Sequence, residues 1–341
     1  MNPCLRTPRA RSWPVEELVE RLRDGDRVAL ARAITLVEST RPEHHAQALE
    51  IIERCMPYTG RSLRVGISGA PGAGKSTLIE ALGTRLTRAG HRLAVLAIDP
   101  SSTRTRSSIL GDKTRMPRLS ADPNAFIRPS PSSGSLGGVA RTTRETILLC
   151  EAAGHDLLFI ETVGVGQSET TAHSMVDFFL VLALAGAGDE LQGIKRGILE
   201  LADAVVITKA DGANREAALH ARRLYQRALR LFPPPPSGWR PPVLTCSALT
   251  GEGLDELWET IDRYRTEMTA SGYFEENRRR QAGDWMRQTI EHRLLDHFYH
   301  HPDVRTHLPA FEAAVLAGET SPFAAAERLL ALYTGRTTSE P

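Results

Sequence analysis

The chain has 341 residues, of which 41% are hydrophobic and 24% are charged, and its formal net charge is +1. This composition is ordinary for a globular protein and is sufficient for one elaborated α/β domain with helical additions. So small a net charge creates no overall field that would attract nucleic acid or an anionic membrane, and we expect neither as a partner.

The cysteines and the apolar runs indicate the compartment. Four scattered cysteines form no CxxC pair, which argues against a disulfide framework and a cysteine-rich metal site. Residues 1–16 contain arginines but no apolar segment typical of a secretory signal. The longest apolar run, Phe178 to Ala187, is about half as long as a membrane helix requires. We therefore expect a buried strand there and a cytoplasmic protein.

Residues 1–60 have the apolar spacing of helices and predict an N-terminal helical extension. A helix that begins after Pro42 places three residues on one face: Ala48, Ile52 and Cys55. An extension of this kind either completes the core or binds a partner.

From Leu63 onward, short β-rich runs alternate with helical stretches. The runs are Val65–Ile67, Leu93–Ile98, Leu157–Ile160, Phe178–Leu184, Ala204–Thr208 and Val243–Cys246. This alternation predicts a mainly parallel central sheet with helices on both faces, in a domain over residues 61–265. Ligands of such a sheet bind at the carboxyl ends of its strands.

No further strand is expected after about Tyr264, and residues 266–341 are predicted to form a C-terminal helical arm. Four apolar residues recur at i+4 steps: Met286, Ile290, Leu294 and Phe298. The arm has too little apolar surface for a core of its own, so it must pack on the main domain or on another subunit. The basic run Arg278 to Arg280 is interpreted as a solvated helix face.

The strongest motif is a phosphate-binding loop that follows the first predicted strand and precedes a helix. It fits GxxxxGK[ST] and consists of Gly69, Ala70, Pro71, Gly72, Ala73, Gly74, Lys75 and Ser76, with Thr77 next in the helix. Its glycines let backbone N–H groups converge on a phosphate at a helix N-terminus. Lys75 is expected to lie between the β- and γ-phosphates, and the Ser76 hydroxyl is expected to bind Mg²⁺.

Two carboxylates follow predicted strands at the same edge of the sheet. Asp99 is a candidate ligand of Mg²⁺ or of its water shell, or alternatively a turn residue before Pro100. Glu161 begins the run Glu161-Thr162-Val163-Gly164, where we expect the carboxylate to hold metal-bound or attacking water. The N–H of Gly164 is expected to contact the γ-phosphate.

Two later loops indicate guanine. Thr208-Lys209-Ala210-Asp211 follows a strand and fits [NT]KxD, in which the aspartate accepts hydrogen bonds from guanine N1–H and the 2-amino group. Adenine lacks both donors and would leave Asp211 unpaired. A second loop contributes Ser247, Ala248 and Leu249, whose backbone N–H groups are expected to bind guanine O6. The sequence therefore predicts GTP or GDP held with Mg²⁺.

With these motifs in place, nearly the whole chain resembles the MeaB/ArgK family of G proteins, which includes the methylmalonic aciduria type A protein. The resemblance is carried by the phosphate loop and by residues 31–38, 99–102, 108–116, 161–169, 188–195, 301–304 and 318–322. It implies a P-loop NTPase, a GTPase of the SIMIBI type. Such proteins are chaperones of adenosylcobalamin-dependent acyl-CoA mutases that gate cofactor loading, protect the mutase and reactivate it.

The resemblance also assigns residues and assembly. It implies a homodimer held partly by the C-terminal arm, Asp112 as a carboxylate on the Mg²⁺ side, and Lys195 reaching towards the nucleotide or the Glu161 loop. The sequence does not name the partner mutase, and enzymes of methylmalonyl-CoA, isobutyryl-CoA, 2-hydroxyisobutyryl-CoA and ethylmalonyl-CoA all stay open. Ras-like proteins have a catalytic glutamine directly after the glycine that corresponds to Gly164. In this chain Gln167 lies three residues after Gly164. We therefore expect slow GTP hydrolysis that the mutase accelerates.

The chain departs from the family at two places. Thr208 stands where the family usually has asparagine, and Thr105-Arg106-Ser107 replaces a Gly-Gly pair. Two other classes share the P-loop: a small-molecule or protein kinase, and a GTPase that inserts metal ions. The first would not need the guanine motifs, and the second would use cysteine and histidine clusters, whereas the clustered His297, His300 and His301 have no cysteine partner.

Overall fold

The computed structural model describes residues 13–39, 41–98, 115–129, 136–162, 167–185 and 196–335. The chain divides into two compact units, Met1–Gln281 and Ala282–Pro341. The first unit contains a central sheet, and the second contains helices alone among its described residues.

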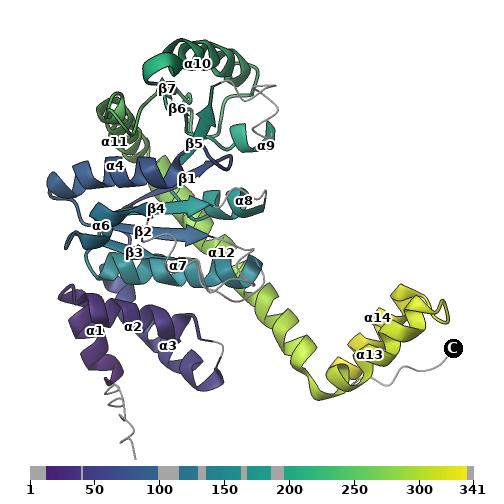
Figure 1. Ribbon diagram of the computed structural model, residues 1–341. Helices are drawn as coiled ribbons and strands as arrows, with labels where there is room; N and C mark the ends of the chain where they lie inside the picture. The colour runs from purple at the N-terminus through teal and green to yellow at the C-terminus, as the bar shows by residue number, and fades with distance from the viewer. Residues whose placement is uncertain are drawn as a thin grey trace, which may run out of the picture. The chain divides into compact units, whose positions relative to one another are not determined.

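The first unit is built on a seven-stranded parallel sheet with the order β3-β2-β4-β1-β5-β6-β7 (Figure 1). The strands are β1 Leu63–Gly69, β2 Leu93–Ile98, β3 Ala125–Arg128, β4 Leu157–Thr162, β5 Phe178–Leu184, β6 Ala204–Thr208 and β7 Val243–Thr245. The predicted α/β fold with a parallel sheet is confirmed, and the apolar run from Phe178 forms the buried strand β5. The sequence did not predict β3, a four-residue strand at the edge of the sheet.

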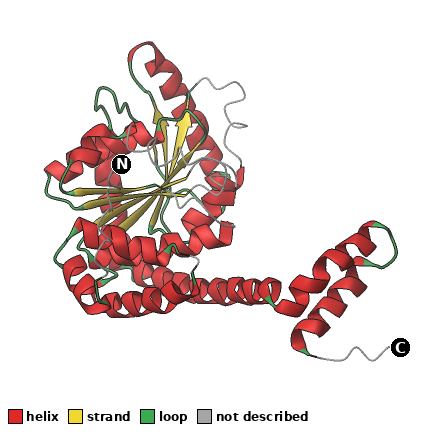
Figure 2. Ribbon diagram, turned by 60° about the horizontal axis from the view of Figure 1, so that its bottom comes forward, coloured by secondary structure: helices red, strands yellow, loops and turns green. Residues whose placement is uncertain are grey.

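Helices lie on both faces of this sheet (Figure 2). Those of the first unit include α4 Lys75–Arg88, α6 Pro117–Ala121, α7 Leu136–Ala152, α8 Gln167–His173, α9 Arg196–Leu199, α10 Arg215–Leu229 and α11 Leu254–Ala270. Apolar residues of α4 and α11 pack with the inward side chains of β1, β4 and β5 in one buried cluster. Helices α7 and α8 contact strands β2, β4 and β1. Burial on both faces explains why these strands are continuous apolar runs.

Three N-terminal helices pack against one another and against α7: α1 Val15–Arg23, α2 Arg27–Val37 and α3 Pro42–Cys55. The predicted face of α3 is nearly right. Ala48 and Cys55 are buried as expected, but the fully buried residue between them is Ile51, and Ile52 is only half-buried. The extension therefore contributes to the core of the first unit.

A buried ionic network lies at the amino ends of β1 and β5. The guanidinium of Arg278 donates to both carboxylate oxygens of Asp177, at 2.8 and 2.6 Å, and to the backbone oxygens of Gly60 and Ser62. Asp177 also accepts from the backbone N–H of Arg64. The interpretation of Arg278 as a solvated residue was wrong, because its side chain is only 12% exposed and its partner's only 1%. Arg279 and Arg280 are exposed as expected.

The second unit contains the end of α12 Tyr273–His300, together with α13 Pro302–Leu316 and α14 Pro322–Thr334. Few of its described residues are buried: Val304, Ala325 and Leu329. The predicted apolar stripe is exposed at Met286, Ile290 and Leu294. Among the described residues, no helix is both long and apolar enough to cross a membrane.

Candidate nucleotide-binding site

The loop between β1 and α4 has the geometry of a phosphate cradle. Gly69, Gly72 and Gly74 have φ angles of 150°, 81° and 84°, which side-chain-bearing residues rarely adopt. A Cβ on Gly69 would lie 2.5 Å from the carbonyl oxygen of Leu182 in β5, so packing also demands glycine there. A Cβ on Gly72 or Gly74 would meet nothing within 4 Å. The open side of the loop therefore leaves room for a ligand, and α4 begins directly behind it.

Lys75 lies beneath this loop as the first residue of α4. Its Nζ donates to the carbonyl oxygens of Gly69, at 2.7 Å, and of Ala70, at 3.3 Å. Burial lowers the pKa of the Lys75 ammonium group, and the nearby carboxylate of Glu161 opposes that shift. A phosphate bound in the cradle would strengthen the charged form, since an anion nearby favours a protonated lysine.

Two oxygen-bearing side chains lie together at the end of β4. The hydroxyl of Ser76 donates to Oε1 of Glu161 at 3.0 Å, and Glu161 is only 8% exposed. Parallel pairing of β1 with β4 sets Ile67 opposite Glu161, which brings the carboxylate to the P-loop. Hydroxyl and carboxylate oxygens suit Mg²⁺, which commonly takes one or two protein ligands and completes its shell with phosphate and water. The described residues contain no cluster of three or more histidine, cysteine or acidic residues that could hold a metal by itself.

Two loops meet beside the cradle at the ends of β6 and β7. The Ser247 hydroxyl donates to Oδ2 of Asp211, and the N–H of Ala210 donates to the carbonyl of Cys246 at 3.0 Å. Lys209 has a φ of 55° and an exposed side chain, so the aliphatic part of that side chain does not pack in the core. The two predicted guanine motifs, 36 residues apart in sequence, are thereby brought together.

The second of these loops is held by its own backbone. The N–H of Ser247 donates to the carbonyl of Glu252 at 2.9 Å, and the N–H of Gly251 donates back to the carbonyl of Ser247 at 2.8 Å. Ala248 is half-buried and Leu249 is 87% exposed. The turn therefore presents residues 248–249 at the surface beside Asp211.

Thr208 connects the two halves of the site. It ends β6, is only 4% exposed, and its hydroxyl lies 2.7 Å from the carbonyl oxygen of Ala73 in the P-loop. The sequence motif places Thr208 near the base, but no local pattern predicts a bond between residues 135 positions apart.

Several predicted residues fall elsewhere. Asp99, Asp112, Gly164 and Lys195 lie outside the described residues, as does the segment Arg104 to Ser107. Gln167 is the first residue of α8. Pro71 lies within the cradle loop, between Gly69 and Gly72, and Thr77 follows Ser76 in α4. The described site therefore consists of the cradle, the Ser76–Glu161 pair and the two base loops.

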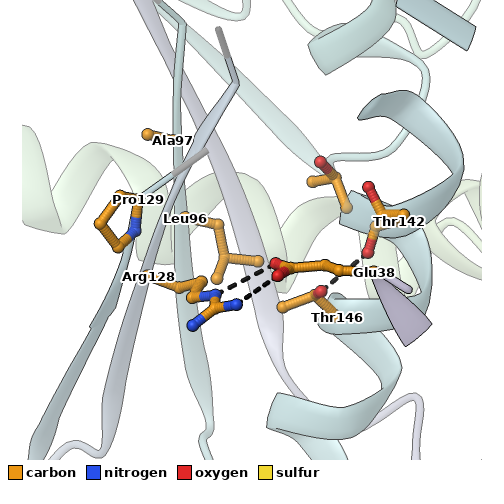
Figure 3. A pocket seen from close by; sticks show the side chains of 8 residues that line it. Glu38, Leu96, Ala97, Arg128, Pro129, Thr142 and Thr146 are labelled. Carbon is orange, nitrogen blue, oxygen red and sulfur yellow. Dashed lines mark hydrogen bonds and ion pairs between the residues drawn. The ribbon is translucent and has the colours of Figure 1, made fainter. Parts of the chain in front are cut away.

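A small cavity lies near the carboxyl ends of β2 and β3 (Figure 3). Arg128, in β3, donates from Nε and Nη2 to the two carboxylate oxygens of Glu38, which follows α2. The other lining residues are Leu96, Ala97, Pro129, Thr142, Thr143 and Thr146. With a volume of about 10 Å³ it has room for a single water molecule at most. The ion pair joins the N-terminal helices to the sheet, and the cavity is too small for a substrate.

Comparisons with known proteins agree with this geometry. A family model described as methylmalonyl Co-A mutase-associated GTPase MeaB matches residues 30–303. A protein of Mycobacterium tuberculosis named a probable GTPase is 56% identical over 316 residues, covering 93% of this chain and 94% of that protein. The methylmalonic aciduria type A homolog, mitochondrial, of Mus musculus is 49% identical over 335 residues, covering 94% and 80%.

A solved structure is similar over almost the whole length. It is described as the crystal structure of LAO/AO transport system kinase, and the match has a TM-score of 0.75 and 40% sequence identity. The match covers 96% of this chain and 99% of that chain. The fold and the helical additions therefore recur together in a relative of known structure.

Proposed function

The chain belongs to the MeaB family of methylmalonyl-CoA mutase-associated GTPases, and from this premise we propose that it is a chaperone of an adenosylcobalamin-dependent acyl-CoA mutase. It is a GTPase, and its family binds guanine nucleotides. We propose further that the GTP cycle gates cofactor loading and protects and reactivates the mutase. The candidate partners are mutases of methylmalonyl-CoA, isobutyryl-CoA, 2-hydroxyisobutyryl-CoA or ethylmalonyl-CoA.

One observation carries the assignment of the nucleotide site: the bond between Ser247 and Asp211 beside the P-loop. This bond orients the carboxylate, and the carboxylate offers acceptors only. Guanine presents two donors, N1–H and the 2-amino group, to such an acceptor. Adenine presents neither, so binding it would leave the acceptors of Asp211 that Ser247 does not use without a donor from the base.

The phosphate side follows from the cradle. We propose that backbone N–H groups within residues 69–76, of which Pro71 has none, bind the β-phosphate and that Lys75 exchanges its bonds to Gly69 and Ala70 for phosphate oxygens. Ser76 and Glu161 are proposed to hold Mg²⁺, with Asp99 and Asp112 on the same side. When bound, the ion neutralises charge that develops on the transferred phosphoryl group.

Hydrolysis requires a water held in line with the γ-phosphate. We propose that Glu161 positions this water directly or through the metal's water shell, since its carboxylate lies beside Ser76. Gly164, Gln167 and Lys195 are proposed to complete the site when the mutase is bound. Intrinsic hydrolysis is then slow, and the partner accelerates it.

The base assignment is tested with Asp211→Asn. An asparagine amide can donate to the C2 carbonyl oxygen of xanthine, whereas it meets the 2-amino group of guanine donor to donor. We expect the variant to lose affinity for GDP and to gain affinity for xanthosine diphosphate, measured by calorimetry with both ligands. An unchanged preference for GDP would place the base elsewhere.

The chaperone assignment is tested by GTP turnover with and without candidate mutases. We expect one mutase to raise the rate well above the intrinsic value, and a pull-down with GDP- and GTP-loaded protein to identify it. Equal rates with every mutase that binds would contradict the proposal that the partner completes the site.

We propose finally that the chain is a cytoplasmic homodimer that uses its C-terminal arm. The exposed apolar residues Met286, Ile290 and Leu294 support this assembly. Among the described residues of the second unit only three are buried, so this apolar stripe stays available for contact with a second copy.

A further inference from the structure

The hydroxyl of Thr208 is committed to protein carbonyl groups. Its Oγ1 lies 2.7 Å from the carbonyl oxygen of Ala73 and 3.2 Å from that of Ala183, and the residue is only 4% exposed. A hydroxyl has one hydrogen, so the contacts with these two acceptors use its whole capacity to donate. What remains on Thr208 for a ligand is lone pairs only.

The geometry of this bond explains what the threonine preserves. Ala73 is fully buried in the P-loop, and its carbonyl oxygen would lose this hydroxyl donor without Thr208. The hydroxyl therefore ties the end of β6 to the loop that binds phosphate. An asparagine at this position has two N–H hydrogens, one of which can make the tie while the other stays available.

Guanine has an acceptor, N7, on the edge opposite its Watson–Crick donors. The second hydrogen of an asparagine amide can serve that acceptor, but Thr208 has no second hydrogen. Base recognition in this chain is thus left to the Asp211 side of the ring.

We propose that this chain reads guanine without a side-chain hydrogen bond to N7 from position 208, and that Thr208 is a positioning residue that ties the P-loop. This inference rests on the proposed nucleotide site. It predicts tolerance for guanine nucleotides in which N7 is replaced by C–H.

The experiment compares dissociation constants for GDP and 7-deaza-GDP in the full-length protein, measured by calorimetry. For the wild type we expect the two constants to agree within about twofold. For Thr208→Asn we expect GDP to bind about 3- to 10-fold more tightly than 7-deaza-GDP, the effect of one neutral hydrogen bond. Discrimination by the wild type as strong as that of Thr208→Asn would overturn the inference, and so would an asparagine variant that does not discriminate.

Two further variants isolate the tie. Thr208→Val keeps the shape and removes the hydroxyl, so we expect both ligands to bind about 3- to 10-fold more weakly while their ratio stays near one. Thr208→Ser restores the hydroxyl and is expected to recover wild-type affinity for both. A valine variant that folds, as shown by its circular dichroism, and binds both ligands like the wild type would overturn the positioning role.

A competition titration with ADP, run beside those with GDP and 7-deaza-GDP, separates this inference from the proposed site. If ADP competes as well as GDP, the guanine site itself is wrong. If GDP wins over ADP but the wild type rejects 7-deaza-GDP, the guanine site stands and the role given to Thr208 falls.

Discussion

Glu161 is a buried carboxylate that stabilises the positive charge of Lys75 in the nucleotide site. Its carboxylate accepts a hydrogen bond from Ser76. It also partly opposes the lowering of the Lys75 pKa that burial causes. Glu161→Gln keeps the shape but removes the charge, so we expect GTP hydrolysis to fall by about 10²- to 10⁴-fold, as for loss of a positioned acid–base group. GDP affinity should change much less. Single-turnover hydrolysis and GDP calorimetry in Mg²⁺ measure both quantities.

A matched control for that variant is Glu259→Gln, which removes the same charge from an exposed position on α11. It should hydrolyse GTP at the wild-type rate. If Glu161→Gln also kept the wild-type rate, the residue that positions the water would have to lie elsewhere.

The buried carboxylate of Glu151 makes the stability of the fold depend on pH, and the direction of its pKa shift gives the sign of that dependence. Burial raises its pKa, but the charge and hydrogen bond of Arg64, with further bonds from Ser62 and Gly60, outweigh burial and hold the pKa below the usual value for glutamate. A carboxylate with a depressed folded-state pKa stabilises the fold above its unfolded pKa of about 4.3, and this contribution is lost as pH falls through the folded value.

We therefore expect Glu151→Gln to flatten the acid limb of stability. Urea unfolding at several pH values between neutral and strongly acidic should show a smaller loss of unfolding free energy in the variant than in the wild type. The variant should also be less stable at pH 7, because Arg64 loses its charged partner. Parallel curves for the two proteins would show that Glu151 is not the linked group.

Sequence motifs indicate candidate site residues where the contacts are local or join two motifs. The P-loop glycines, Lys75 and Ser76 are contiguous, and the bond between Asp211 and Ser247 joins two recognised motifs. The tie between Thr208 and Ala73 and the pair of Arg278 with Asp177 span long sequence separations, so no local pattern reports them. In the basic run, position in the fold alone distinguishes buried Arg278 from its exposed neighbours.

At the scale of elements, the contrast between an apolar run and its flanking residues decided which strands could be predicted. Six strands are apolar runs that stood out between helical stretches, whereas β3, Ala125–Arg128, has four residues and ends in an arginine. It becomes a strand through pairing with β2, in which Leu93 lies opposite Ala125. Tertiary pairing therefore defines this edge of the sheet more than intrinsic propensity does.

The first turns of α12 are held to the sheet by Arg278. Its guanidinium binds Asp177 with two hydrogen bonds and also binds two backbone carbonyls at the start of β1. Arg278→Ala would leave the Asp177 carboxylate buried with its strongest partner removed. We expect a loss of about 3–5 kcal/mol in unfolding free energy, measured with urea. Arg279→Ala, one residue on and exposed, should change it by less than about 0.5 kcal/mol.

At the scale of the whole molecule, the sheet separates two kinds of polar cluster. The carboxyl ends of β1, β4 and β6 hold the P-loop, Glu161 and Thr208, while the amino ends of β1 and β5 hold the ionic network of Arg278. Backbone N–H groups and open space characterise the first cluster, and the second is closed by mutual ion pairs. Ligand binding at the carboxyl edge is the general rule for parallel sheets.

The second unit leaves an apolar stripe uncovered, and this stripe tests the proposed dimer. Ile290 is 51% and Leu294 57% exposed on α12, and burying each against a second copy would contribute about 1.5–3 kcal/mol. Leu294→Asp replaces that gain with the cost of burying a charge, so we expect the dimer dissociation constant to rise at least about tenfold. Sedimentation velocity across a concentration series measures this shift. Arg293→Asp adds an aspartate at the preceding exposed position and should leave the dimer intact. A Leu294→Asp protein that dimerises like the wild type would place the interface on another surface.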